Sequence, residues 1–147
     1  MDATAVTDPL ALERQVCFAL AVASRSVIAL YRPVLEPMGL THPQYLVMLA
    51  LWERESRSVS ELAELLALDP GTLSPLLRRL ETSGLVDRRR DPADERVLQV
   101  TLTAAGRALR TRAEQVPAAI VERLGVDVSE LEELHVALTR VIAQARG

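Results

Sequence analysis

The chain has 147 residues, a formal net charge of −3 and one cysteine. Its length predicts one domain, residues 1–147. We find neither an apolar run long enough to cross a membrane nor a signal-type segment, so we expect a soluble, cytoplasmic protein without a membrane partner. One cysteine excludes an intrachain disulfide framework, and with only two histidines we expect no metal site and no cofactor.

The distribution of charge matters more than its sum. All 17 basic side chains are arginines. Five of them lie between Arg78 and Arg90, where only Glu81 and Asp87 oppose them, whereas acidic groups gather near the other end, at Glu130, Glu132 and Glu133. Counterion release depends on the charge at the contact surface, so an acidic protein with a basic face can still bind DNA.

The chain begins with residues before Pro9, which we expect to form a mobile tail, and continues as a long amphipathic helix within 9–38. Apolar residues recur at spacings of three and four over 16–30, and a neighbouring apolar stripe covers 17–31. A helix that is apolar over more than one face needs two sets of neighbours, its own domain and a further surface. We expect prolines to end it, at Pro33 and Pro37.

Two capping boxes mark the next helices. Thr41 with Gln44, and Ser58 with Glu61, place a hydroxyl and a longer side-chain acceptor three residues apart, where each satisfies a backbone N–H at a helix start. The apolar residues that follow each box recur at helical spacing. We therefore expect helices over 41–52 and 58–67.

A further helix starts at Asp69 and Pro70, an N-cap followed by proline at the first helical position, and is expected to run to about Ser83. Leucines form its apolar stripe, and the other faces carry Thr72, Ser74, Pro75, Arg78 and Arg79. Arginine forks onto guanine edges or phosphates, and hydroxyls bond to either, so this helix suits recognition in a major groove. The alternative is the solvated face of an ordinary helix.

A hairpin is predicted after Gly84, which is a candidate left-handed C-cap. Strands over 85–90 and 96–102 flank a turn at 91–95. Its base carries three arginines, and its tip carries one that can enter a minor groove: Arg88, Arg89, Arg90 and Arg96. Asp94 lies two residues before Arg96, and we expect its carboxylate to hold that side chain in place.

The last part of the chain predicts two more helical stretches. Thr103 is an N-cap candidate for a helix to about Leu124 that bends or restarts around Pro117. Gly125 closes that helix, and Asp127 with Glu130 caps the final one. The terminal helices supply more apolar residues than so small a middle needs. They indicate either core within a monomer or, more economically, an interleaved homodimer.

The predicted fold class is therefore mainly α with a small β-hairpin wing, a winged helix-turn-helix. Residues 40–103 form the DNA-binding region, and residues 9–38 and 104–147 form interleaved dimerisation helices. The expected partners are a second copy of the chain and a double-stranded DNA operator. Two-fold symmetry places two recognition helices on successive turns of DNA, so the operator is expected to be an inverted repeat.

This layout resembles the MarR family of winged-helix repressors through nearly the full chain. The likeness is carried by Gly84-Leu85-Val86 with the arginine run, by Asp91-Pro92-Ala93-Asp94-Glu95-Arg96, and by Leu102-Thr103-Ala104-Ala105-Gly106. At the first helix, Cys17-Phe18-Ala19-Leu20, Ala23-Ser24-Arg25, Leu30-Tyr31-Arg32-Pro33 and Pro43-Gln44-Tyr45-Leu46 resemble the organic-hydroperoxide sensor branch.

The resemblance implies that an organic hydroperoxide oxidises Cys17 and that oxidation releases the operator. It also implies that Tyr31 contacts the cysteine of the other subunit. Within one helix the two residues are about 21 Å apart at ~1.5 Å per residue, so only a partner's antiparallel helix can join them. The chain departs from the branch at Ala21 and His42, where tyrosines are usual. His42 can substitute as a donor or as a cation, or have no partner at all.

Other functions stay open on sequence alone. A repressor of the same family could be released by a small lipophilic or aromatic anion bound near Tyr31, His42 and Tyr45, with Cys17 a buried structural residue. A one-cysteine thiol peroxidase would need activating groups around Cys17 that the local sequence does not supply, so we expect no catalytic residues and no enzyme. A helical adaptor that binds no DNA is the fourth reading.

Overall fold

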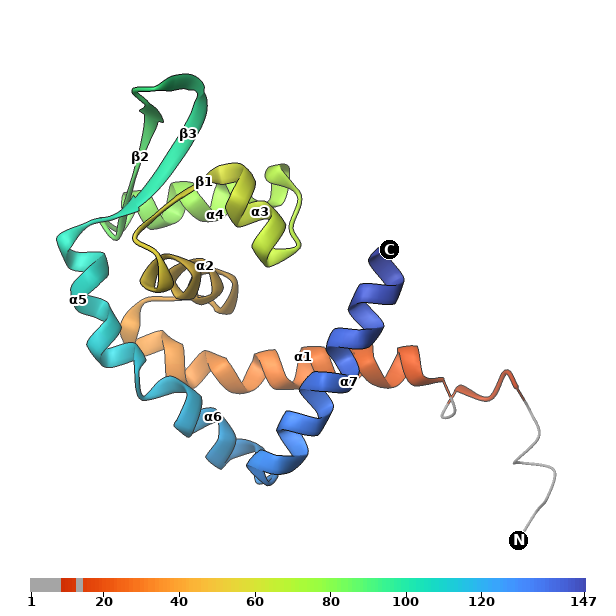
Figure 1. Cartoon of the computed structure of the whole chain (residues 1–147). Coiled ribbons are helices and arrows are strands. Elements are labelled where there is room, and N and C mark those ends of the chain that lie inside the picture. Colours follow the sequence, from red (N-terminus) through yellow and green to blue (C-terminus); the bar gives the residue numbers. More distant parts are fainter. Residues whose placement is uncertain (1–8, 13–14) are drawn as a thin grey trace, which may run out of the picture.

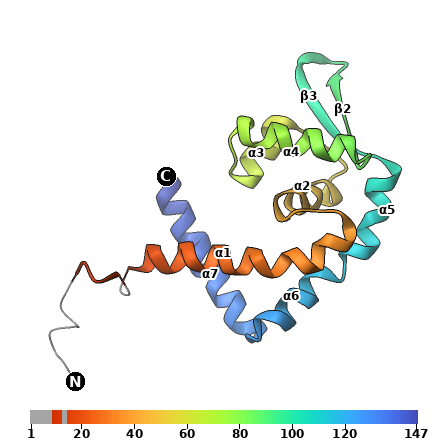
Figure 2. The same ribbon diagram turned by 180° about the vertical axis from the view of Figure 1, so that it is seen from behind.

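The computed structural model describes residues 9–12 and 15–147. The predicted tail before Pro9 lies outside the described residues. The elements are α1 (Val16–Leu35), η2 (Glu36–Met38), α2 (His42–Glu53), β1 (Ser56–Ser58), α3 (Val59–Leu66), α4 (Pro70–Thr82), β2 (Val86–Asp91), β3 (Asp94–Leu102), α5 (Ala104–Ala113), α6 (Val116–Leu124) and α7 (Val128–Arg146). Figures 1 and 2 show α2 between α1 and the α3–α4 pair, with the β2–β3 wing projecting beyond α4. The predicted fold class is confirmed.

Side-chain caps open several of these helices. At α2 the predicted capping box is complete, because Gln44 N donates to Thr41 Oγ1 over 3.3 Å and Thr41 N donates to Gln44 Oε1 over 3.0 Å. At α3 only half of the predicted box forms: Glu61 N donates to Ser58 Oγ over 3.1 Å. The Glu61 carboxylate pairs with Arg54 instead, since a cation is a stronger partner than a neutral amide.

Two other predicted caps lack their side-chain bond. Asp69 and Asp127 occupy the N-cap positions of α4 and α7, but neither side chain caps the helix. The prediction of a restart around Pro117 is confirmed, because α5 ends at Ala113 and α6 begins at Val116 with proline in its first turn. Gly84 and Gly125 adopt the predicted left-handed conformation.

Helix α1 differs from its prediction at both ends. It begins at Val16 rather than near Leu10, and it passes through Pro33 to end at Leu35. Pro33 is exposed, so its ring faces solvent. By length and composition alone, 16–38 is apolar enough to cross a membrane, contrary to the sequence expectation. The core helix of a soluble protein passes the same test, so length and composition do not establish a membrane span.

The sheet has three strands rather than the two predicted, in the order β1-β3-β2, and all pairs are antiparallel. β1 pairs Ser56 with Thr101, and the two hydroxyls lie 2.9 Å apart. The three residues of β1 carry no alternating pattern, so only the pairing with β3 identifies them as a strand. β1 attaches the wing to α2, because Arg57 is buried and its Nε donates to the Ala50 carbonyl over 2.9 Å.

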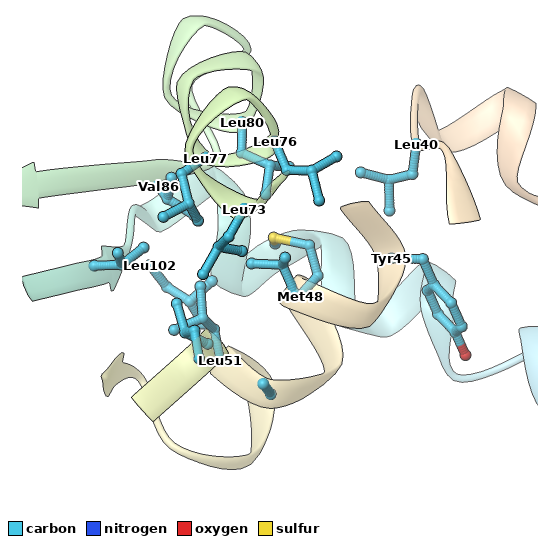
Figure 3. Close-up of a cluster of buried hydrophobic side chains, with 14 of the residues drawn as sticks. Leu40, Tyr45, Met48, Leu51, Leu73, Leu76, Leu77, Leu80, Val86 and Leu102 are labelled. Atoms are coloured by element: carbon cyan, nitrogen blue, oxygen red, sulfur yellow. The ribbon is translucent and has the colours of Figure 1, made fainter. Parts of the chain in front are cut away.

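The hydrophobic core lies between α2, α3, α4 and the sheet (Figure 3). Met48, Leu51, Leu73 and Leu77 are fully buried there. The terminal helices lie largely outside this core. Within the single chain α1 buries only Leu35, and α7 buries no residue. Large apolar side chains are instead exposed along both helices, at Val16, Phe18, Val22, Ile28, Val128, Leu134, Val136, Val141 and Ile142.

Helix α5 attaches to the winged part through one close approach. Trp52 Nε1 donates to the Gly106 carbonyl over 2.9 Å, and Gly106 N donates to Thr103 Oγ1 over 3.0 Å. A Cβ at Gly106 would lie 2.2 Å from the carbonyl oxygen of Leu85. Only glycine therefore allows α5 to pack against the backbone at the start of the wing.

Candidate DNA-binding surface and cysteine site

Helix α4 separates into an inner and an outer face, as its sequence predicts. Its four leucines at 73, 76, 77 and 80 are buried. The predicted recognition residues lie on the other faces: Thr72, Pro75, Arg78 and Arg79 are exposed, and Ser74 is half-buried. Pro75 sits inside the helix without ending it. The outer face thus presents two guanidinium groups and short polar groups to solvent, and contact with DNA remains a prediction.

The wing is longer and its turn tighter than predicted. β2 continues to Asp91 and β3 starts at Asp94, so Pro92 and Ala93 alone connect them. Asp91 Oδ1 accepts a hydrogen bond from Ala93 N over 2.8 Å, which closes the turn locally. Arg89 and Arg90 are exposed on β2.

Near the tip, Asp94 holds Arg96 in the predicted way. Asp94 Oδ1 accepts from the backbone N of Arg96 over 3.1 Å and from its Nε over 3.0 Å, and Oδ2 accepts from Nη2 over 3.3 Å. These hydrogen bonds lower the pKa of the Asp94 carboxyl. The Arg96 side chain is still 90% exposed. A fixed orientation with an exposed guanidinium suits insertion into a groove.

Arg88 is placed differently from the other wing arginines. Its Nη2 donates to Glu81 Oε1 over 3.2 Å and its backbone N donates to Glu81 Oε2 over 3.2 Å. The hydrogen bond from the guanidinium lowers the pKa of Glu81. Only 20% of the Arg88 side chain is exposed. Arg88 was expected on the DNA surface, whereas Glu81 had no predicted role, although the opposite charges of the two residues across a helix-to-strand turn were a visible signal.

Cys17 lies in the first turn of α1, and it is exposed. Tyr31 belongs to the same helix, so the two do not meet within one chain. The alternative interpretation, in which Cys17 is a small buried residue, does not agree with the exposure of Cys17 in the single chain.

Tyr31 and His42 do come together, on α1 and α2. Their ring centroids are 4.7 Å apart in an edge-to-face arrangement, and Tyr45 lies 5.8 Å from Tyr31. Tyr45 also contacts Trp52, at 6.5 Å between centroids. Burial raises the pKa of Tyr31 and lowers the pKa of His42. His42 is therefore neutral near pH 7, which favours its reading as a donor over its reading as a cation.

A cavity of about 550 Å³ opens beside this cluster, between the second half of α1 and the start of α2. Its lining includes Ile28 and Leu40, which are apolar, two cations, Arg25 and Arg32, and one carboxylate, Glu36. His42 is the one member of the predicted effector site that lines it; Tyr31 and Tyr45 do not. A largely apolar cavity in which two guanidinium groups outnumber one carboxylate suits a small organic anion. Within the described residues, no cluster of three or more His, Cys, Asp or Glu could hold a metal ion.

Comparison with known proteins identifies the family. The MarR family profile matches residues 40–98. The chain is 38% identical over 140 residues to the organic hydroperoxide resistance transcriptional regulator of Bacillus subtilis, covering 93% of this chain and 95% of that protein. It is 43% identical over 134 residues to the HTH-type transcriptional regulator TtmR of Methylorubrum extorquens, covering 91% and 69%.

Among solved structures, reduced AbfR bound to DNA superposes with a TM-score of 0.79 at 34% identity, covering 92% of each chain. Overoxidized AbfR bound to DNA superposes with a TM-score of 0.70 at 37% identity, covering 88% of this chain and 94% of that chain. These relatives are regulators rather than enzymes. From the family match, the full-length relatives and the shared winged fold, we conclude that the chain belongs to the MarR family of DNA-binding transcriptional regulators.

Proposed function

We propose that the chain is a dimeric repressor that releases its operator when an organic hydroperoxide oxidises Cys17. The observation that carries the proposal is an exposed cysteine on a helix whose apolar face the single chain leaves uncovered. The likeness to an organic hydroperoxide resistance regulator supports it. Regulation of transcription also supports location in the cytoplasm, where bacterial DNA lies.

The proposed dimer pairs α1, α6 and α7 of two copies. It divides the chain into a winged region, 40–103, and dimerisation segments, 9–38 and 104–147. The exposed apolar residues of α1 and α7 support this division, because large apolar side chains gathered on two exposed helices mark an interface. A charged residue there should separate the copies. We expect Val141→Glu to sediment as a monomer, and sedimentation as a stable dimer would contradict this interface.

On DNA, each copy would place α4 in a major groove and its wing in the adjacent minor groove of an inverted repeat. The exposed guanidinium groups of Arg78, Arg79 and Arg96 support this arrangement, as does the DNA-bound state of AbfR. Arg89 and Arg90 add positive charge along the wing, whereas Arg88 is engaged with Glu81. Arg78→Ala and Arg96→Ala should each weaken binding about tenfold, the cost of one good base contact.

The proposed redox step balances without a cofactor. The Cys17 thiolate attacks the terminal oxygen of the hydroperoxide, and the O–O bond breaks as a sulfur–oxygen bond forms. The leaving alkoxide takes a proton and departs as an alcohol, so sulfur is oxidised by two electrons and the peroxide is reduced. The chain has no second cysteine. The sulfenic acid therefore reacts with a small thiol or a backbone nitrogen, or oxidises further.

Operator binding before and after cumene hydroperoxide tests the proposal, with a small thiol present in one arm and excess peroxide in another. Mass spectrometry of the same samples reports the state of Cys17. Wild type should lose affinity once Cys17 carries an oxygen or a thiol adduct, and Cys17→Ser should not. Undiminished affinity of fully modified wild type would overturn redox control. Because AbfR is also found on DNA when overoxidized, the thiol arm is the more sensitive one.

A second candidate function is release by a small aromatic anion, with Cys17 uninvolved. The cavity beside His42, with Arg25 and Arg32 in its lining, favours it. Thermal-shift measurements with a series of aromatic carboxylates would distinguish the two. Stabilisation that Cys17→Ser retains and Arg32→Ala loses, together with release of DNA, would establish ligand control in place of oxidation.

A further inference from the structure

The wing is fixed to the rest of the protein only near its base. Val86, Val100 and Leu102 are buried at that end of the β2–β3 ladder. Gln99 is the outermost residue of β3 that pairs with β1, opposite Ser58. Beyond it, residues 90–98 are all described by the structure and none of them is buried. The outer part of the wing is therefore held by its own ladder, and its direction depends on what fixes the base. Figure 1 shows this part projecting past α4.

The outermost tie between the wing and α4 is the contact of Glu81 with Arg88. Glu81 lies in the last turn of α4, and Arg88 lies on β2 opposite Val100. Each carboxylate oxygen of Glu81 accepts one hydrogen bond from Arg88, one from the backbone N and one from Nη2, both over 3.2 Å. The contact thus holds the main chain of the strand as well as its side chain.

The burial of the Arg88 guanidinium indicates that this contact is more than a surface ion pair. The Nε of Arg88 is buried and has no partner within the described part of the chain, so the guanidinium stays against α4 at the cost of an unsatisfied donor. The connection between helix and strand is short and turns at Gly84, whose φ is 77°. Leu85 N donates to the Leu80 carbonyl over 3.0 Å, and Thr103 holds the connection at the base of the wing, donating from Oγ1 to the Gly84 carbonyl over 2.6 Å and from N to the Leu85 carbonyl over 3.1 Å.

We infer that Glu81 is a positioning residue for DNA binding, which through Arg88 sets the angle between the recognition helix and the wing. The inference rests on the proposed placement of α4 and the wing in adjacent grooves. From Arg88 to the turn at Asp91 the strand extends about 10 Å at ~3.3 Å per residue. Loss of the contact frees β2 from α4 beyond the base that Thr103 and β1 hold. The outer hairpin can then bend away from α4, and a small bend moves Arg96 away from the groove while α4 stays in place.

The direction of the change in DNA affinity distinguishes a positioning role of Glu81 from a purely electrostatic one. Glu81 carries negative charge beside the proposed DNA surface, so its removal would strengthen binding if charge alone mattered. A positioning role predicts the opposite. Glu61, on the adjacent helix α3, provides a matched control, because it also pairs with an arginine, Arg54, and that arginine does not belong to the wing.

The test uses the full chain and a duplex selected by wild type from a random-sequence pool. Affinity is measured at one salt concentration for Arg96→Ala in three backgrounds: wild type, Glu81→Ala and Glu61→Ala. We expect Glu81→Ala to weaken binding about tenfold by itself, similar to Arg96→Ala, and the two changes together to cost little more. In the Glu61→Ala background, Arg96→Ala should retain its full effect. Glu81→Gln keeps the shape of the side chain and one of its two acceptor oxygens. Its affinity for the duplex should lie between those of wild type and Glu81→Ala.

The outcomes are distinguishable. If Glu81→Ala binds more tightly, or if its effect and that of Arg96→Ala simply multiply, Glu81 does not position the wing and the proposed function is untouched. If Arg96→Ala has no effect in wild type, the wing contact itself fails and the inference fails with it. Circular dichroism of each variant in the absence of DNA establishes that it is folded. Should Glu81→Ala not fold, the same cycle with Glu81→Gln decides between coupled and independent effects.

Discussion

Gly106→Ala should destabilise the protein, although alanine is the better helix former. A Cβ at this position would lie 2.2 Å from the Leu85 carbonyl oxygen and 3.1 Å from Leu102 Cδ2. The nearer obstacle is backbone, so α5 must retreat by roughly 1 Å to restore ordinary contact. Overpacking of this kind costs about 1–3 kcal/mol. The retreat also stretches the hydrogen bond from Trp52 Nε1 to the Gly106 carbonyl.

The helix propensity of alanine offsets up to about 1 kcal/mol of this cost. The expected net loss is about 1 kcal/mol, or a fall in Tm of about 2–4 °C for a chain of this size. Thermal unfolding followed by circular dichroism measures it, at one protein concentration because a dimer's Tm depends on concentration. Gly71→Ala is the matched control: it is helical and has nothing within 4 Å of its added Cβ.

We expect Gly71→Ala to leave Tm unchanged or to raise it. If Gly106→Ala raised Tm by a similar amount, the close approach of α5 to the start of the wing would be refuted, and with it the explanation of why this position is glycine.

Two other predictions concern the aromatic cluster. Burial lowers the pKa of His42 below its usual 6.5, so the unfolded chain takes up the proton first. The resulting contribution to stability is fully present above about pH 6.5 and is lost as pH falls toward the lower folded-state pKa. The Tm advantage of wild type over His42→Gln should therefore shrink from pH 7.5 to pH 5.5, roughly the range that this titration covers. A constant difference between the two proteins would contradict the burial of His42. Trp52→Phe removes the donor to the Gly106 carbonyl and should cost about 1 kcal/mol in urea unfolding, and an unchanged midpoint would show that this bond does not hold α5.

The order of the elements and most of their boundaries followed from local signals. Thr41 with Gln44, and Thr103, mark helix starts because a cap is complete within four residues. The leucines of α4 predict its buried face because helical spacing brings them to one side. Asp94 and Arg96 are close enough in sequence for their contact to be predicted. In all these cases both partners lie within one or two turns of chain, so sequence is sufficient.

Only the tertiary structure could decide contacts between distant residues. β1 exists because Ser56 meets Thr101 on the neighbouring strand, and its own three residues carry no strand pattern. Gly106 is required because the fold brings Leu85 against α5. Arg88 turns toward Glu81 rather than toward solvent because the helix and strand are packed together. The sequence shows which groups can form such contacts, but the packing of the core determines which of them meet.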